Sequence, residues 1–149
     1  MSATRIELTV ADGAGPADVD AVCRAVLTTV WTRLSWFELD LRGLTERAET
    51  ASAAATLEPY RRLGWLRRRP TSTVHLVPGK DDAALEAALR LLTSTIGSAA
   101  MAGDGEVVYD VNDEGSSCWF ELTEDERAAV EQRLRDAGAS TDLLVPFDG

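Results

Sequence analysis

The segment EVVYDVNDEGSSCWFEL, residues 106–122, decides the fold more clearly than any other part of the sequence. Two runs rich in β-branched and aromatic residues, 106–111 and 117–122, flank a polar stretch that contains Gly115. Such runs favour β-strands, and a short polar stretch with glycine between them is typical of a hairpin turn. The segment therefore predicts two antiparallel strands joined by a turn.

The residues that follow this hairpin predict a helix and a final strand. Thr123 and Glu126 have the spacing of a capping box, which satisfies free N–H groups at a helix start. We expect the helix to end at Gly138, because glycine adopts the left-handed backbone of many helix ends. A short strand, 143–145, stops at Pro146 and is expected at a sheet edge, since proline donates no backbone hydrogen bond.

The spacing of hydrophobic residues predicts the elements before the hairpin. Strands are expected at 5–10, 37–42 and 72–77, helices at 16–34 and 81–96, and a weak alanine-rich helix at 45–57. The small residues of 97–105 are interpreted as a loop. The predicted order of elements is therefore β-α-β-(α)-β-α-β-β-α-β.

This order indicates an α+β (mixed α/β) fold of two layers. We expect a mixed five- to six-stranded sheet with helices mainly on one face. The length of 149 residues is that of one ordinary domain, so residues 1–149 are predicted to form a single globular domain. Residues 45–70 are interpreted as an irregular or weakly helical insert that carries an arginine cluster.

The sequence also bears on the cellular location. The first ten residues lack a basic head followed by a long apolar run, and no segment has the apolar length that spans a bilayer. Cys23 and Cys118 are the two cysteines, and we interpret them as reduced thiols in the core. The expectation is a soluble cytoplasmic protein that needs no cofactor.

The charge is unusually large and unevenly placed. The chain has 25 acidic and 15 basic residues, a net charge of −10, which argues against nucleic-acid and membrane binding and favours a basic partner. Residues 104–126 contain nine acids and no basic residue. The basic counterpart is a cluster between residues 61 and 69 that consists of Arg61, Arg62, Arg67, Arg68 and Arg69.

The alternation of the strands predicts which side chains leave the core. If the hydrophobic residues at 37, 39, 118 and 120 face inward, the intervening residues face the other side of the sheet. These intervening residues are Trp36, Glu38, Asp40, Trp119 and Glu121. Tryptophans with a charged rim are typical of protein interfaces, so we expect a partner-binding surface here. The alternative is that helices cover this face and bury both indoles.

The hairpin segment DVNDEGSSCWFE, residues 110–121, resembles the calcium-binding loop of EF-hand proteins. The resemblance covers the oxygen ligands Asp110, Asn112, Glu114 and Glu121, with Gly115 at the sharp turn. It implies a calcium site between two helices. The β-branched and aromatic flanks predict strands instead, so the alternative interpretation is an acidic hairpin turn without a metal.

These observations favour an acidic protein-binding module that recognises a basic protein partner, such as a toxin-neutralising protein of the immunity or antitoxin kind. One alternative is a small enzyme whose site gathers scattered residues, including Tyr60, His75 and acids of 104–121. His75 is the only histidine, and no catalytic motif accompanies it. A second alternative is a homodimer or larger homo-oligomer, in which the arginine cluster meets the acidic half of a neighbouring copy or of the same chain.

Overall fold

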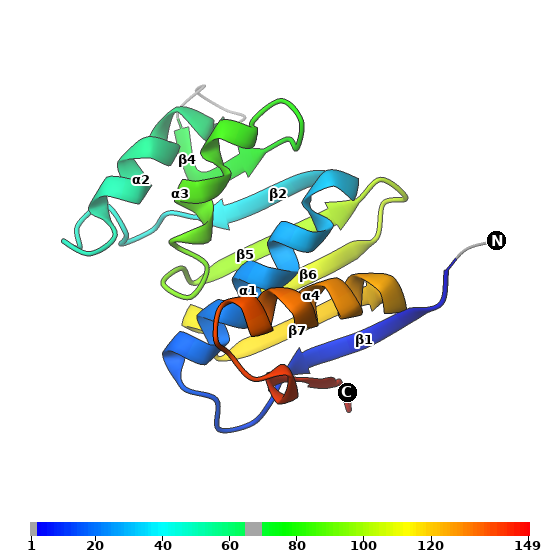
Figure 1. Ribbon diagram of the computed structural model, residues 1–149. Helices are drawn as coiled ribbons and strands as arrows, with labels where there is room; N and C mark the ends of the chain where they lie inside the picture. The colour runs from blue at the N-terminus through cyan, green and yellow to red at the C-terminus, as the bar shows by residue number, and fades with distance from the viewer. Residues whose placement is uncertain (1–2, 65–69) are drawn as a thin grey trace.

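The computed structural model describes residues 3–64 and 70–149 and forms one sheet with helices on one side (Figure 1). Within these residues the strands are β1 (Arg5–Val10), β2 (Leu34–Asp40), β3 (Arg61–Leu63), β4 (Pro70–Leu76), β5 (Gly97–Ala102), β6 (Val107–Asn112), β7 (Ser117–Thr123) and β8 (Leu144–Pro146). The helices are α1 (Pro16–Val30), α2 (Ala51–Leu57), α3 (Leu85–Leu89) and α4 (Glu124–Asp136). Short 3₁₀ turns join several of these elements.

The strands lie in the order β3-β4-β2-β5-β6-β7-β1-β8, and every neighbouring pair is antiparallel. This order corrects two expectations. The described residues form eight strands rather than five or six, and the sheet is antiparallel rather than mixed. The two-layer α+β class is confirmed.

The chain connections explain why the helices share one face. Because neighbouring strands alternate in direction, β1 is parallel to β2, β2 to β3, β4 to β5, and β7 to β8. Each of these pairs is joined through one helix, α1 to α4 in turn. Crossovers between parallel strands are almost always right-handed. The crossovers through α1 and α2 run across the sheet towards β3, whereas those through α3 and α4 run towards β8 and start from strands that point the other way. Because both the direction across the sheet and the direction of the strands are reversed, right-handed connections place all four helices on the same face, as Figure 1 shows.

Aromatic rings form the centre of the core. Phe37, Tyr109 and Phe120 are fully buried, with ring centroids 6.1 Å apart for Phe37 and Tyr109 and 5.7 Å apart for Tyr109 and Phe120. Trp31 extends this row, 6.1 Å from Phe37. The hydroxyl groups of Tyr109 and Ser98 share a hydrogen bond of 2.9 Å, which satisfies the polar atom of the buried phenol.

Strand β5 is the main element that sequence reasoning missed. Its residues, GSAAMA, have little intrinsic preference for strands and were therefore expected in a loop. In the sheet, Ala100 is paired with Phe37 on one side and with Tyr109 on the other. A small side chain between two large rings lets both rings pack in the core. The loop prediction was wrong because residues distant in sequence set the size required at this position.

The helix expected at 81–96 is much shorter than predicted. Helix α3 ends at Leu89, and Ile96, which was expected to face inward, is 43% exposed. The chain turns at residues 90–94, and at the end of this turn Thr95 Oγ1 donates a hydrogen bond of 2.6 Å to the Asp40 carbonyl. Hydroxyl side chains that bond to the backbone in this way compete with helix formation.

The hairpin and the helix after it are confirmed. Strands β6 and β7 pair across a turn in which Asp113 and Glu114 adopt φ of 52° and 57°. Helix α4 begins with the predicted capping box, since Thr123 accepts a hydrogen bond from the Glu126 N–H and Glu126 accepts one from the Thr123 N–H. Gly138 lies just beyond the helix with φ of 76°.

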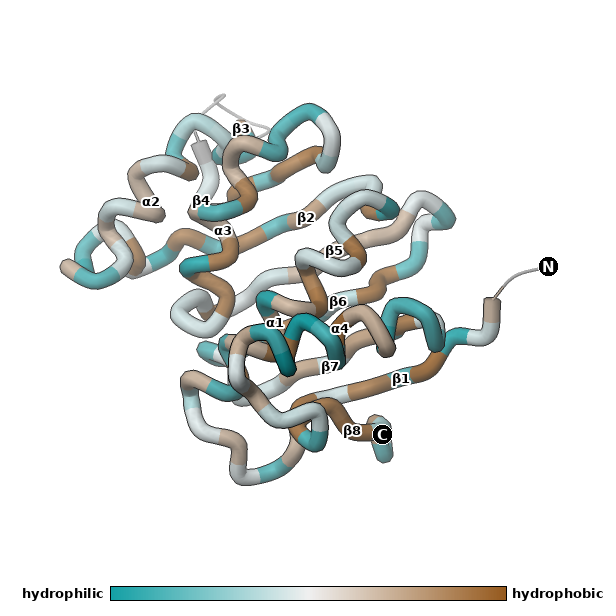
Figure 2. The backbone as a smooth tube through the Cα atoms, in the orientation of Figure 1, coloured by the Kyte–Doolittle hydropathy of each residue, from teal (hydrophilic) through white to brown (hydrophobic). Residues whose placement is uncertain are grey.

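Figure 2 shows hydrophobic positions alternating with hydrophilic ones along the strands, whereas many positions of α4 are hydrophilic. The hydrophobic positions lie under the helices, where the core is. Among the described residues, no helix is long and apolar enough to cross a membrane.

Candidate partner-binding face

The face of the sheet opposite the helices is called the open face. Its middle is a row of directly paired residues on five neighbouring strands: His75 (β4), Glu38 (β2), Ala99 (β5), Asp110 (β6) and Trp119 (β7). Paired residues on neighbouring strands point to the same side of a sheet. None of the helices in residues 3–64 and 70–149 covers this row, because all of them lie on the other face (Figure 1).

The predicted surface residues lie on this face. In β2 and β7 the hydrophobic residues that were expected to face the core are buried, which confirms the predicted alternation. The residues between them are half-buried: Trp36, Glu38, Asp40, Trp119 and Glu121. Strands β5 and β6 separate the two tryptophan-bearing strands. The backbones of these two strands are therefore about 15 Å apart, since neighbouring strands lie about 4.8 Å apart.

On the Trp36 side of the open face, side chains from β2, β3 and β4 contact one another. The rings of Trp36 and His75 lie 6.0 Å apart with an interplanar angle of 34°. His75 Nδ1 is 3.2 Å from Glu38 Oε1, and the Arg62 guanidinium donates to the same oxygen at 2.6 Å. Arg62 comes from the edge strand β3. This half therefore holds an indole, an imidazole and a carboxylate that is already paired with a cation.

The Trp119 side has a different set of partners. The Trp119 indole Nε1 donates to Glu7 Oε1 at 3.1 Å, across the boundary between β7 and β1. On the other side of Trp119, Asp110 is its direct partner in β6, and Asn112 donates to Asp110 Oδ1 at 2.9 Å. Trp119 therefore has a carboxylate on each neighbouring strand, Glu7 on β1 and Asp110 on β6. The side chains that donate hydrogen bonds to these carboxylates, Trp119 and Asn112, are both neutral.

A shallow groove of about 220 Å³ lies on the open face over β2, β4, β5 and β6, and neither tryptophan is among the residues that line it. Gly97 and Ala99 of β5 form its floor, and Glu38 and Asp110 belong to its walls. The floor is low because the side chains of β5 on this face near the groove are small. Ligand pockets usually enclose about 300–1,000 Å³, so this groove is better suited to side chains of a protein partner than to a small substrate.

The remaining carboxylates of the open face are paired with arginines. Asp40 accepts a hydrogen bond of 3.2 Å from the Arg42 guanidinium, and Glu121 accepts one of 3.2 Å from Arg5. Arg5 also contacts Asp104, and this contact lowers the pKa of the Asp104 carboxyl below its ordinary value. Glu7 and Asp110 form no ion pair with any cation that the structure describes.

The arginine cluster is divided in the structure. Arg61 forms an ion pair of 2.7 Å with Glu58, three residues earlier in the chain, whereas Arg62 reaches the open face. The other members, Arg67, Arg68 and Arg69, lie outside the described residues. Within the chain, Arg61 and Arg62 are paired with acids from the first half of the sequence rather than with the acids of 104–126.

The calcium-binding interpretation does not fit the geometry. The segment 110–121 is flanked by strands β6 and β7 rather than by helices, which corrects the expectation taken from EF-hand proteins. Glu121 pairs with Glu7 of β1 and accepts from Arg5, while Glu114 lies in the exposed turn. Within the described part of the chain, no group of three or more His, Cys, Asp or Glu residues could hold a metal ion.

The residues suggested for an enzyme site are dispersed. His75 contacts Glu38, and three strand boundaries separate it from Asp110 along the row. Tyr60 packs against the core. Contact with the Cys118 thiol and burial raise the pKa of the Cys23 thiol well above its ordinary value, which disfavours a nucleophilic thiolate at that position.

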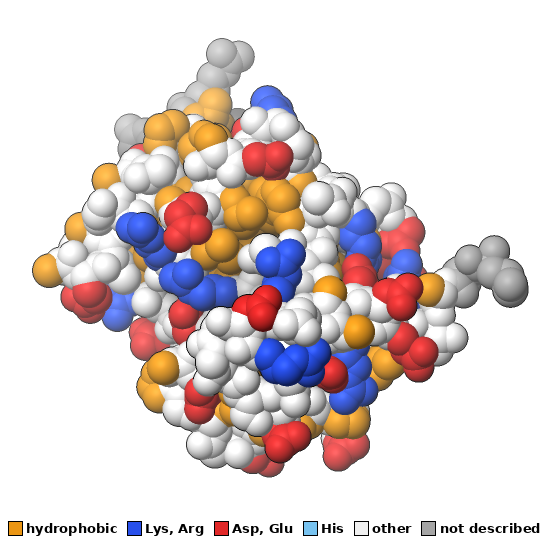
Figure 3. Space-filling model, in the orientation of Figure 1, with side chains coloured by type: hydrophobic (Ala, Val, Ile, Leu, Met, Phe, Trp, Pro, Cys, Tyr) orange, Lys and Arg blue, Asp and Glu red, His pale blue; other side chains and the backbone are white. Residues whose placement is uncertain are grey.

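A larger hollow, of about 580 Å³, lies on the opposite side of the molecule, between α1, α3 and α4. Figure 3 shows this side of the molecule. Hydrophobic side chains lie there between the pair of helices α1 and α4 and the pair α2 and α3, and charged residues surround them. Two of the charged residues that line the hollow are paired with each other: Asp20 accepts a hydrogen bond of 2.8 Å from Arg24, and it also accepts one of 3.3 Å from Thr93. The open face carries more side chains suited to recognition, including both half-buried tryptophans.

Glu7 was not predicted from the sequence as a site residue, and Asp110 was considered as a calcium ligand and as one of the acids of 104–121, not as a neighbour of Trp119. Glu7 alternates with the hydrophobic residues of β1, so its outward direction was predictable. The position of Glu7 beside Trp119 was not predictable, because β1 and β7 are more than 100 residues apart in sequence. Comparisons with protein-family models, curated proteins and solved structures found no match to this chain.

Proposed function

We propose that this protein is an acidic protein-binding module that recognises a basic protein partner through the open face. The observation that carries the proposal is the pair of half-buried indoles, Trp36 and Trp119, on a sheet face with Glu7, Glu38 and Asp110 close by. Aromatic anchors surrounded by charged residues are characteristic of protein interfaces. The net charge of −10 would steer a cationic partner towards the protein before contact.

Small acidic proteins that neutralise basic toxins, as immunity proteins or antitoxins do, fit this mode of action. Binding would bury Trp36 and Trp119 against the partner and cover its basic surface. The two free, buried cysteines are consistent with a reducing compartment, and we place the interaction in the cytoplasm. The shallow groove and the dispersed titratable residues give less support to an enzyme.

The test is a calorimetric titration with protamine, an arginine-rich basic protein, as the probe. We expect the double variant Trp36→Ala/Trp119→Ala to bind at least about thirtyfold more weakly, because truncation of an interface anchor costs about 2 kcal/mol or more. The control is Glu46→Gln/Glu49→Gln, which removes two exposed charges from the segment before α2.

The control separates recognition by the open face from attraction by net charge. We expect it to weaken binding much less than the tryptophan variant. A tryptophan variant that binds like the wild type, or no more weakly than the control, would contradict the proposal. Toxin neutralisation is tested separately by expressing the product of the adjacent reading frame in cells, alone and together with this protein. Growth that stops with the product alone and is restored by co-expression supports that role, and growth that co-expression does not restore contradicts it.

A further inference from the structure

The two tryptophan sites of the open face have the same chemistry but a different charge balance. Each consists of a half-buried indole with a neighbouring carboxylate. At the Trp36 site, the carboxylate of Glu38 is occupied by the Arg62 guanidinium at 2.6 Å. At the Trp119 site, Glu7 and Asp110 receive only the neutral donors of Trp119 and Asn112 among the described side chains.

The Trp119 site offers acceptors on both sides of the ring. Asp110 belongs to β6 and Glu7 to β1, the two strands that flank β7. Asp110 is level with Trp119, whereas Glu7 is level with Glu121, two residues further along β7. The backbones of Asp110 and Glu7 are therefore about 12 Å apart, two strand spacings across the sheet and two residues along it, with strand β7 between them. Both carboxylates have further lone pairs, since each accepts a single hydrogen bond from another side chain.

A guanidinium fits this arrangement better than an ammonium group. It is planar and weakly hydrated, so it stacks on an indole, and its donors point outward in the plane, where they can reach a carboxylate beside the ring. An ammonium group is a compact, strongly hydrated charge and stacks less well. Arg62 at the Trp36 site is an example, within this chain, of a guanidinium held by such a carboxylate.

We propose that the Trp119 site binds one arginine side chain of the basic partner, with the guanidinium on the indole and ion-paired to Asp110 and Glu7. This inference rests on the proposed function and names the residue type that the open face selects. On the Trp36 side, Arg62 holds the carboxylate of Glu38, and the ring of His75 lies 6.0 Å from the indole. The partner arginine therefore binds at the side of the face that this chain leaves without a cation of its own among the described residues.

The test uses two short amidated peptides that are identical except that one carries two arginines and the other two lysines. They are titrated into ¹⁵N-labelled protein, and the indole N–H resonance of Trp119 is assigned with the variant Trp119→Phe. We expect this resonance to shift with the arginine peptide, and the lysine peptide to bind several-fold more weakly.

The decisive variant is Glu7→Gln/Asp110→Asn, which removes both charges and keeps oxygens that accept from Trp119 and Asn112. We expect it to bind the arginine peptide about tenfold more weakly. Glu46→Gln/Glu49→Gln, which removes the same charge elsewhere, should change the affinity by less than about twofold.

Three results would overturn the inference. They are equal losses in the two double variants, equal affinity for the two peptides, and shifts confined to the Trp36 side. The last result would leave the open face as the binding surface, so it would refute this inference and not the proposed function. Peptide binding that shifts neither indole resonance would refute both.

Discussion

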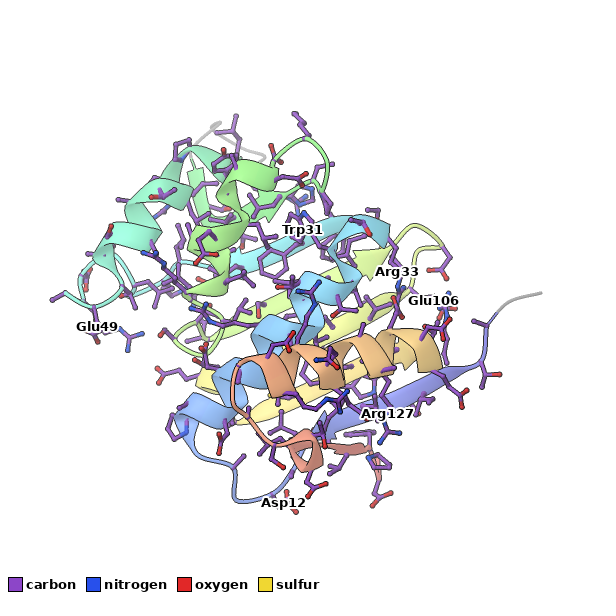
Figure 4. All side chains as sticks on the ribbon, viewed as in Figure 1. Asp12, Trp31, Arg33, Glu49, Glu106 and Arg127 are labelled. Carbon is purple, nitrogen blue, oxygen red and sulfur yellow. The ribbon has the colours of Figure 1, made fainter. Side chains whose placement is uncertain are left out.

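At the scale of single residues, the tryptophans divide into structural and surface roles. Trp31 is 5% exposed, and its indole N–H donates to Asp82 at 2.8 Å. In Figure 4, Trp31 lies close to the end of α1, on the helical side of the sheet. Trp119, in contrast, is half-buried on the open face and packs against no helix that the structure describes.

This division predicts opposite effects of truncation on stability. Trp31→Ala should lower the free energy of unfolding by about 3–5 kcal/mol, because it leaves a cavity in the core. Trp119→Ala should lower it by less than about 1 kcal/mol, because little packing is lost on the open face. Urea unfolding followed by circular dichroism measures both values. Similar losses in the two variants would show that Trp119 is part of the core.

Arg62 is predicted to limit binding rather than assist it. It neutralises Glu38, one of the acids of the open face, through an exposed ion pair. Arg62→Ala should therefore raise the affinity for protamine about fivefold, about 1 kcal/mol, in a calorimetric titration.

A matched control makes this prediction specific. Arg90→Ala removes the same charge from the end of α3 on the helical side, where Arg90 faces Glu86 at 3.7 Å. It should raise the affinity much less than Arg62→Ala. Equal gains would indicate that net charge alone governs binding, and a loss with Arg62→Ala would mean that Arg62 contacts the partner.

At the scale of elements, β5 shows how a strand is formed by its neighbours. Ala100 lies between Phe37 and Tyr109 on the core side, and Ala99 lies between Glu38 and Asp110 on the open face. Ala100→Val should lower the free energy of unfolding by about 1–3 kcal/mol, because two extra methyl groups crowd the rings. Ala99→Val should be neutral or stabilising, since valine favours strands. Thermal unfolding of both variants tests this contrast, and equal effects would contradict it.

A second element-scale prediction concerns the N-terminus of α4. The Arg33 guanidinium binds both oxygens of Glu126, at 2.5 and 3.0 Å, and also the Glu121 carbonyl at 3.2 Å. Glu126 also completes the capping box with Thr123. Arg33 therefore ties the chain that enters β2 to the start of α4, and Figure 4 shows it next to that end of the helix.

Arg33→Ala should lower the free energy of unfolding by about 1–3 kcal/mol, because a half-buried carboxylate loses a bidentate partner. Arg127 provides the control, since it pairs with Glu131 along the surface of α4 at 3.1 Å. Arg127→Ala should cost about 0.5 kcal/mol, as for other pairs of this spacing. Chemical unfolding measures both, and a smaller loss for Arg33→Ala would show that the contact does not stabilise the fold.

At the scale of the whole molecule, acid sensitivity is predicted from contacts between distant segments. The Trp31 indole and the Gly79 N–H lower the pKa of Asp82 below its ordinary value of 3.8. A carboxylate with a lowered pKa in the folded state stabilises the fold above its unfolded-state pKa, and this contribution is lost as the pH falls through the folded-state pKa. Asp82→Asn should therefore be less stable than the wild type at pH 6, and the difference should shrink towards about pH 2.

Unfolding in urea at about pH 6, 4 and 2.5 measures this difference. The control is the same substitution in a Trp31→Phe background, which lacks the indole donor. There the loss of stability caused by Asp82→Asn should be smaller at pH 6. A loss that is constant with pH, or that grows in acid, would contradict the assigned cause.

Local patterns predicted much of the fold. The hairpin of β6 and β7, the capping box of α4 and the inward alternation of β2 depend on neighbouring residues, and all three are confirmed. The eight-stranded order and the shortened α3 were not predictable in the same way. Strand β5 has no local pattern, and the chain after α3 is held by a hydrogen bond from Thr95 to the carbonyl of Asp40, which is distant in sequence.

The sequence by itself determined the acidic charge, the two-layer class and the direction of Trp36 and Trp119 relative to their own strands. Only the tertiary structure decided that both indoles share an uncovered face, and that Arg62 neutralises Glu38 while Glu7 and Asp110 flank Trp119. The physical reason is that alternation along a strand is a local property of the backbone. Which strands become neighbours depends instead on the burial of side chains that lie far apart in the chain.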